Sequence, residues 1–130
     1  MIFIFAIDTP ANTPATHKVG TNLQLSAGKI TEVHLQFPPG LDGLAHISIN
    51  DGLHQLWPTN PEADFCTSED VIIFAEDIDI GPDSNSLTAY TWNLDDTYDH
   101  TITVRIVVAT PEEETSWLDE AKQLLGLSSA

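Results

Sequence analysis

The chain has 130 residues, with 20 acidic and 4 basic side chains and a formal net charge of −16. This charge repels phosphate groups, which argues against a nucleic-acid-binding protein and against binding to anionic membranes. The hydrophobic share of 42% and the length fit one folded domain and are not typical of a disordered chain. The acidity is regional, because residues 38–100 hold thirteen carboxylates and no Lys or Arg, whereas residues 1–37 balance two acids with two lysines.

The chain begins with a short apolar run, which makes residues 2–7 a weaker strand candidate. The run lacks a preceding basic segment and leads directly into Asp8, so it does not resemble a secretion signal. No stretch approaches the length of a transmembrane helix. Residues 8–21 show no periodicity and predict an extended arm or linker that leads to a weaker strand at 22–26.

Two segments alternate between apolar and polar residues, which is typical of strands with one buried face. In residues 30–37 every second side chain from Val33 is apolar, and the run ends at Pro38 because proline cannot donate to a ladder of backbone hydrogen bonds. The segment 101–108 repeats the pattern with four inward side chains, Ile102, Val104, Ile106 and Val108.

The segment 45–57 predicts a β-hairpin that turns at Asp51-Gly52, since both positions tolerate the positive φ angles of a type I′ turn. A two-residue loop at this place gives three cross-strand pairs, Ile47–Leu56, Ser48–Gln55 and His46–Trp57. Apolar and polar pairs then fall on opposite faces, which favours this register over a slip of one residue.

Two more segments complete the predicted strands. The continuous apolar run 71–75 indicates a strand covered on both faces, and 87–93 is a β-rich run with Tyr90 and Trp92 on one face. Eight short strands separated by Gly, Pro, Asn and Asp predict an all-β antiparallel β-sandwich, with a jelly roll or an immunoglobulin-like arrangement as the topology. We expect an N-terminal strand and arm at 1–21, the sandwich at 22–109, and a C-terminal helix and tail at 110–130.

The C-terminus changes to a helical period. Thr110 suits an N-cap, Pro111 the first helical position, and the acids that follow suit the positive end of the helix dipole. One apolar stripe runs along the predicted amphipathic helix until Gly126, formed by Trp117, Leu118, Ala121, Leu124 and Leu125. The stripe either packs on its own sandwich or docks into a neighbouring subunit.

The acid-rich segment 76–85 offers several hard oxygen ligands, and Asp77, Asp79 and Asp83 are therefore weak calcium candidates. It does not match an EF-hand loop, because counting from Asp77 places Gly81 at the fifth position and Thr88 at the twelfth. The simpler interpretation is a solvated strand, with Asp77 and Asp79 facing water. Residues 93–100 are interpreted as a polar hairpin loop before the last strand.

Known catalytic motifs are absent from the sequence. The five histidines include no close pair of the kind found in helical zinc motifs, and there is no G-x-S-x-G motif. Cys66 is the only cysteine, so one chain forms neither a disulfide nor a Cys-based zinc cage. We therefore assign no catalytic, cofactor-binding or metal residue, and we expect no enzyme. The aromatic side chains have two interpretations: exposed, they could form a platform for a sugar, and buried, they would belong to the core, which is the favoured interpretation. The residues concerned are Trp57, Tyr90, Trp92 and Tyr98.

Three segments resemble the strand ends of small β-sandwich virion proteins of tailed phages. They are Phe37-Pro38-Pro39-Gly40, His54-Gln55-Leu56-Trp57-Pro58-Thr59-Asn60-Pro61, and Tyr98-Asp99-His100-Thr101-Ile102-Thr103-Val104-Arg105. The resemblance covers residues 22–109 and contains no catalytic signature. It implies a structural role, as a capsid decoration or auxiliary protein or as a collar or tail component that holds neighbouring subunits together.

The two chain ends favour assembly, since an extended segment and an apolar helix face are common means of docking. We therefore predict a non-enzymatic virion protein that forms homo-oligomers, contacts the major capsid protein or other virion subunits, and is made in the host cytoplasm without a secretion signal. The expected contact residues are Ile2, Phe3, Phe5, Trp117, Leu118, Ala121, Leu124 and Leu125. The alternative is a carbohydrate- or calcium-binding sandwich module, including a collar or tail adhesion component.

Overall fold

The computed structural model describes residues 1–110, and this range contains eight β-strands and one short 3-10 helix. The strands are β1 (Ile2–Thr9), β2 (Val19–Gln24), β3 (Gly28–Phe37), β4 (Ala45–Asp51), β5 (His54–Trp57), β6 (Asp70–Ile80), β7 (Ser86–Asn93) and β8 (His100–Ala109). The 3-10 helix η1 is Ala15–His17. The predicted C-terminal helix begins at the edge of this range, and its apolar stripe lies outside the described residues.

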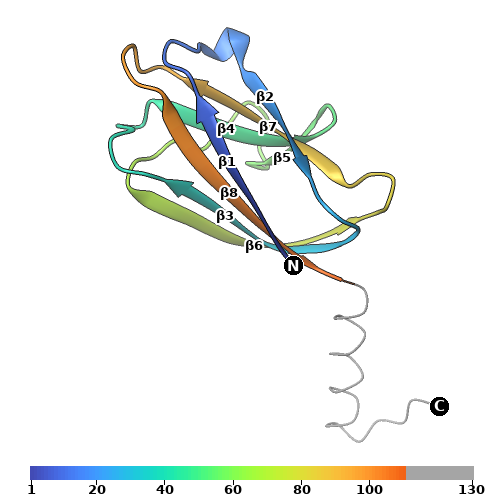
Figure 1. Ribbon diagram of the computed structural model, residues 1–130. Helices are drawn as coiled ribbons and strands as arrows, with labels where there is room; N and C mark the ends of the chain where they lie inside the picture. Colours follow the sequence, from blue (N-terminus) through green and yellow to red (C-terminus); the bar gives the residue numbers. More distant parts are fainter. Residues whose placement is uncertain (111–130) are drawn as a thin grey trace, which may run out of the picture.

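The strands form two four-stranded antiparallel sheets that pack on one another (Figure 1). Sheet A has the order β1-β8-β3-β6, and sheet B has the order β2-β7-β4-β5. The pairs β1–β8, β2–β7, β3–β6 and β4–β5 are nested in the sequence, as in one long hairpin folded over on itself. The predicted all-β antiparallel sandwich is therefore confirmed.

The core lies between the sheets and contains every second residue of the central strands. In β8 the four inward side chains, from Ile102 to Val108, are almost completely buried, and β3 contributes Val33, Leu35 and Phe37. Burial of such side chains is the main favourable term in folding, at about 25 cal/mol per Å² of apolar surface. Trp57 is also in this core, which agrees with the favoured interpretation of that residue.

Residues 1–21 do not form a separate arm. β1 pairs along its whole length with β8, and the Met1 amino group donates to the carbonyl oxygen of Val108 at 2.8 Å. The chain then crosses to sheet B, where Thr13 exchanges two backbone hydrogen bonds with Asn93. The sandwich therefore extends from 2 to 109. Residues 2–7 are all apolar, so the sequence does not show the alternation of a strand with one exposed face. This explains why the sequence indicated a boundary between residues 21 and 22.

The β4–β5 hairpin has a different register from the predicted one. Its two-residue loop is Gly52-Leu53, one residue later than expected, and Gly52 adopts a φ of 59°. Asp51 pairs with His54, and an irregularity after Ile49 brings that residue opposite Trp57. The actual pairing places the buried Ile49 and Trp57 side chains together on the core side, which the predicted register did not.

Strand β6 is longer and more exposed than expected. The run 71–75 was predicted to be covered on both faces, but β6 is an edge strand and Ile73 is 57% exposed. The sequence shows only that both faces of this strand are apolar. An apolar outer face can also be exposed to solvent, so the pattern does not establish that it is buried. Farther along, Ile80 is buried while Asp77 and Asp79 are exposed, which confirms the predicted alternation.

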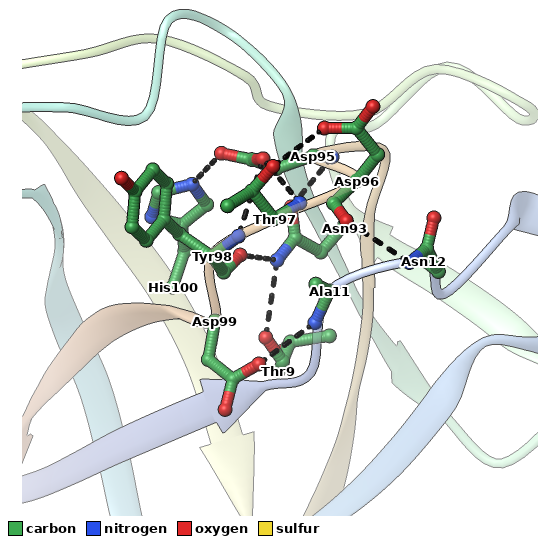
Figure 2. Close-up of polar contacts among 10 residues, drawn as sticks. All are labelled: Thr9, Ala11, Asn12, Asn93, Asp95, Asp96, Thr97, Tyr98, Asp99 and His100. Atoms are coloured by element: carbon green, nitrogen blue, oxygen red, sulfur yellow. Dashed lines mark hydrogen bonds and ion pairs between the residues drawn. The ribbon is translucent and has the colours of Figure 1, made fainter.

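The connection between β7 and β8 is not a hairpin loop, because β7 belongs to sheet B and β8 to sheet A. Residues 94–99 therefore cross between the sheets. Their carboxylates organise this connection, as Figure 2 shows: Asp95 accepts hydrogen bonds from the backbone N–H groups of Thr97 and Tyr98 and lies 2.8 Å from Nε2 of His100. The acids in this segment thus stabilise a sheet-to-sheet connection.

Candidate functional site

The outward side of sheet A brings exposed apolar side chains together. The strand registers define three rows of outward residues across the four strands, which are Ile2–Val107–Glu32–Ala75, Ile4–Arg105–His34–Ile73 and Ala6–Thr103–Gln36–Val71. We call these twelve residues the sheet A outer face. The two edge strands that bound it, β1 and β6, are visible at the sides of sheet A in Figure 1.

The sheet A outer face is apolar at its edges and neutral at its centre. Ile2 and Ile4 are 63% and 64% exposed on one edge. At the centre, Arg105 donates to Oε1 of Gln36 at 3.1 Å, and Nε2 of His34 lies 2.5 Å from Oε1 of Glu32. Arg105 and Glu32 are the only formal charges in the three rows, and they balance. Exposed apolar side chains along both edges, on a face without net charge, suit this surface to protein contact.

The predicted contact residues of β1 lie on two sides of the strand. Ile2 belongs to the sheet A outer face. Phe3 and Phe5 alternate with it, point toward the sandwich interior and are partly buried against the core. Ile4 takes the outward position that lies between them. The other predicted contact residues, Trp117, Leu118, Ala121, Leu124 and Leu125, lie outside the described residues.

The calcium candidates lie along β6 and in the turn that follows it. Asp77 and Asp79 are exposed on the outward side of sheet A, and Oδ1 of Asp77 lies 3.2 Å from Nζ of Lys29. Asp83 is exposed in the turn. In the described part of the chain, these three carboxylates are not brought together as a set of ligands within 4.8 Å of one another. Asp77 and Asp79 thus occupy a solvated strand face.

A cleft of about 380 Å³ opens between the two edge strands that end the sheets, β5 and β6. Trp57 contributes from β5, Phe74 and Glu76 contribute from β6, and Phe65 contributes from the connecting loop. The indole Nε1 of Trp57 donates to Oε1 of Glu76 at 2.8 Å. The cleft therefore combines aromatic walls with one carboxylate, which is a composition that suits a small polar ligand with an apolar face.

A second group of polar side chains lies on the outward side of sheet B. Ile47 of β4 and Phe65 of the β5–β6 loop exchange two backbone hydrogen bonds of 3.0 and 2.9 Å. Because side chains alternate along extended backbone, the neighbours of these residues point to the opposite side from them. His46, Asp64 and Cys66 therefore share one side, and one ligand atom from each lies within 4.8 Å of the others. We call these three residues the His46 cluster.

The imidazole of the His46 cluster is held from two directions. Its Nδ1 lies 2.6 Å from Oδ1 of Asp64. Its ring stacks on Trp92 of β7, with centroids 5.1 Å apart and planes 8° from parallel. Nζ of Lys18 lies 4.3 Å from the Trp92 ring centroid. Trp92 is thus covered on the outward side of sheet B, and the predicted pairing of His46 with Trp57 is replaced by the contact with Trp92.

The His46 cluster does not activate its cysteine. The pKa of the Cys66 thiol lies above its ordinary value, first because the sulfur is partly desolvated, and then because the Asp64 carboxylate repels a thiolate and accepts the thiol proton. A nucleophilic cysteine requires the opposite shift, which a neighbouring cation or imidazolium supplies. The shift in the Cys66 pKa is therefore opposite in direction to that of an activated cysteine.

No pattern in the sequence identifies the His46 cluster. His46 and Asp64 are eighteen residues apart, and no spacing motif connects a strand residue with a residue of a later loop. One weak signal exists, the Asp64-x-Cys66 spacing, which places both side chains on one side of an extended segment. The partner of that pair becomes evident only when Phe65 is seen beside Ile47.

Comparison with protein-family models, curated proteins and solved structures found no match for this chain. Within residues 1–110 no helix has the length and the apolar character that crossing a membrane requires. The function is accordingly inferred from the residues and from their arrangement in the fold.

Proposed function

We propose that this protein is a non-enzymatic structural component of a virion, a decoration or auxiliary protein that coats or stabilises a phage particle through subunit contacts. The observation that carries the proposal is the sheet A outer face, where Ile2, Ile4 and Ile73 are exposed around a charge-balanced centre. In a chain with a net charge of −16, a face that carries one acid and one base adds little like-charge repulsion between it and a partner. Its partners are other copies of the chain and the major capsid protein or another virion subunit.

The topology supports the proposal at the level of fold. Two four-stranded sheets with nested strand pairs in the orders β1-β8-β3-β6 and β2-β7-β4-β5 correspond to a jelly roll. Jelly rolls occur in viral capsid proteins and in lectins. This support is an analogy, since one fold serves many functions. The three phage-like segments add to it, because they lie at strand ends of this same sandwich.

The two edges of sheet A differ in a way that selects one of them for docking. An unpaired edge offers backbone N–H and C=O groups to another chain, and charged residues protect against such pairing. β6 carries Asp70, Glu76, Asp77 and Asp79, whereas β1 has one charged side chain, Asp8, next to its end. We therefore assign the contact to the β1 side of the sheet A outer face.

Sedimentation velocity of the full chain at increasing concentration, together with co-sedimentation with capsids, tests this assignment. The double variant Ile2→Asp/Ile4→Asp places two charges on the outer face, and we expect it to weaken self-association or particle binding at least about tenfold. The matched control is Leu53→Asp, because Leu53 is 103% exposed at the β4–β5 turn in the other sheet.

The proposal requires that the control behave as the unchanged protein does. A chain that stays monomeric at high concentration and does not bind particles contradicts it. An equal loss of association in the Leu53→Asp control also contradicts the proposal, because added negative charge would then weaken association wherever it is placed. Circular dichroism of each variant verifies the fold, which these exposed positions should leave intact.

The cleft between β5 and β6 favours one alternative, a carbohydrate-binding module such as a collar or tail adhesion component. Aromatic faces beside a carboxylate are a common way to bind a sugar ring, and the jelly roll is also a lectin fold. A glycan array followed by calorimetry tests it. Retention that Glu76→Gln abolishes and Asp83→Asn leaves unchanged supports the alternative, and absence of any retained glycan contradicts it.

A further inference from the structure

We propose that His46, Asp64 and Cys66 form a binding site for a zinc-class divalent cation on the outward side of sheet B. Within residues 1–110 they are the only group of three or more His, Cys, Asp or Glu side chains whose ligand atoms lie within 4.8 Å of one another. Imidazole, carboxylate and thiolate are the three ligand types that zinc takes in proteins. The inference concerns a different face from the sheet A outer face and does not depend on the proposed assembly.

The distances require only small side-chain movements to become those of a zinc site. Ligand atoms around tetrahedral zinc are about 3.3–3.7 Å apart, as follows from bond lengths of about 2.0–2.3 Å. Nδ1 of His46 and Oδ1 of Asp64 are now 2.6 Å apart, and the widest separation in the cluster is below 4.8 Å. Shifts on the order of 1 Å therefore bring the three atoms to one ion, with a fourth position left for water.

Asp64 is the residue toward which the other two side chains converge. Oδ1 of its carboxylate lies 2.6 Å from Nδ1 of His46, and the sulfur of Cys66 lies within 4.8 Å of both ligand atoms. A divalent cation at this place would replace the Nδ1 proton of His46 and the thiol proton of Cys66. The thiol proton passes to solvent and the ring proton moves to Nε2, which leaves Nδ1 and the thiolate free to bind the ion.

The surrounding structure fixes the site before any ion binds. Trp92 holds the plane of the His46 ring, and the paired backbone of Ile47 and Phe65 holds the loop that carries the other two ligands. Residues 38–100, which supply all three ligands, contain no Lys or Arg. The ammonium group of Lys18, from outside this region, lies over the Trp92 ring. Such preorganisation and negative charge both favour cation binding.

A bound ion would also act on the cleft between β5 and β6. Phe65 lies between the two loop ligands and points the other way, where it stacks on Phe74 with centroids 6.0 Å apart. An ion at the His46 cluster ties the loop to β4 and thereby holds Phe65 in the cleft wall. The loop is then the part of the molecule that we expect the ion to stabilise most.

The test uses the full chain, purified without a histidine tag, reduced and freed of metal with a chelator. Calorimetry with Zn²⁺ should give one site per chain, and Co²⁺ should give the near-ultraviolet sulfur-to-cobalt charge-transfer absorption of a thiolate ligand. Cys66→Ser should abolish that absorption. Cys66→Ser, Asp64→Asn and His46→Gln should each weaken Zn²⁺ binding by about 100-fold or more, because loss of a residue that only hydrogen-bonds to a metal ligand already lowers metal affinity by about 10–100-fold. Ca²⁺ and Mg²⁺ should not compete.

His34→Gln is the matched control. His34 also contacts a carboxylate, that of Glu32, but in the described residues it belongs to no cluster of three ligand side chains. It should bind Zn²⁺ with unchanged affinity. The proposal is overturned if the unchanged protein shows no saturable Zn²⁺ binding, or if Cys66→Ser retains both the affinity and the cobalt absorption. Protection of Cys66 from alkylation by Zn²⁺ gives a second readout, and equal alkylation with and without the ion also overturns it.

Discussion

Asn93, at the end of β7, donates a hydrogen bond from its side-chain amide to the carbonyl oxygen of Thr9, at the end of β1, over 3.2 Å (Figure 2). The two strands belong to different sheets, and both residues are buried. The same amide donates to the carbonyl oxygen of Tyr98 at 2.9 Å, and its oxygen accepts from the N–H of Asp95 at 3.0 Å. One side chain thus joins the two sheets and the segment that crosses between them.

Replacing Asn93 should destabilise the sandwich strongly. Asn93→Ala leaves the carbonyl oxygens of Thr9 and Tyr98 without this donor, and we expect a loss of about 2–4 kcal/mol in the free energy of unfolding, because unsatisfied buried polar groups are costly. Urea unfolding followed by tryptophan fluorescence measures it. Asn22→Ala, at an exposed position of β2, is the control and should change stability by less than about 0.5 kcal/mol. An equal loss in the free energy of unfolding in the two variants would mean that the Asn93 hydrogen bonds do not stabilise the sandwich.

The carboxylate of Asp95 makes the stability of this connection depend on acid. Hydrogen bonds from the N–H of Thr97, and then from His100, hold the pKa of Asp95 below its ordinary value of 3.8. A lowered pKa in the folded state adds stability above the ordinary value, and this stability is lost as the pH falls through the lowered pKa.

We therefore expect Asp95→Asn to lower the melting temperature at pH 7 and to differ less from the unchanged protein as the pH falls below 3.8. Thermal unfolding of both proteins between pH 7 and pH 2 measures the difference. Asp83→Asn, in an exposed turn, should give nearly the same curve as the unchanged chain. A melting-temperature difference for Asp95→Asn that is constant with pH would show that its charge is not the cause.

Gly28 permits the close approach of β3 to the end of β8. A Cβ atom at this position would lie 2.4 Å from the carbonyl oxygen of Ala109 and 2.8 Å from Cγ1 of Val108. We expect Gly28→Ala to cost about 1–3 kcal/mol, since the backbone must move to relieve the overlap. Gly81→Ala has nothing within 4 Å of the added atom and is the matched control in a denaturant titration. A Gly28→Ala protein as stable as the Gly81→Ala protein contradicts the expectation.

The acids of β6 should be dispensable for assembly. We expect the triple variant Asp77→Asn/Asp79→Asn/Asp83→Asn to associate as the unchanged chain does, because the proposed contact lies on the β1 side of sheet A. Sedimentation velocity and a melting curve with and without Ca²⁺ measure both properties. Loss of association would mean that the contact lies on the β6 side, and a calcium-dependent rise in melting temperature that the variant loses would restore the calcium site.

Strand positions were the most predictable part of this protein. The segments 30–37 and 101–108 alternate so regularly that their buried and exposed sides follow from the sequence, and the structure confirms both. β1 and the first part of β6, residues 71–75, were harder, because edge strands with apolar residues on both faces show no alternation. Their outward apolar residues, including Ile4 and Ile73, then form the proposed contact face, which no local pattern distinguishes from core.

The sheet A outer face and the His46 cluster differ in how much of each can be predicted from the sequence, and the reason is physical. Alternation along a strand is a local property, so chemistry and direction of a side chain can be inferred from a few neighbouring residues, as for Ile2 and Asp79. Pairing between distant segments depends on the packing of the whole sandwich, and a shift of one residue reverses every side chain. The hairpin turn at Gly52-Leu53 and the meeting of His46 with Asp64 and Cys66 are consequences of such pairing. They became evident only once both sheets had closed around their shared core.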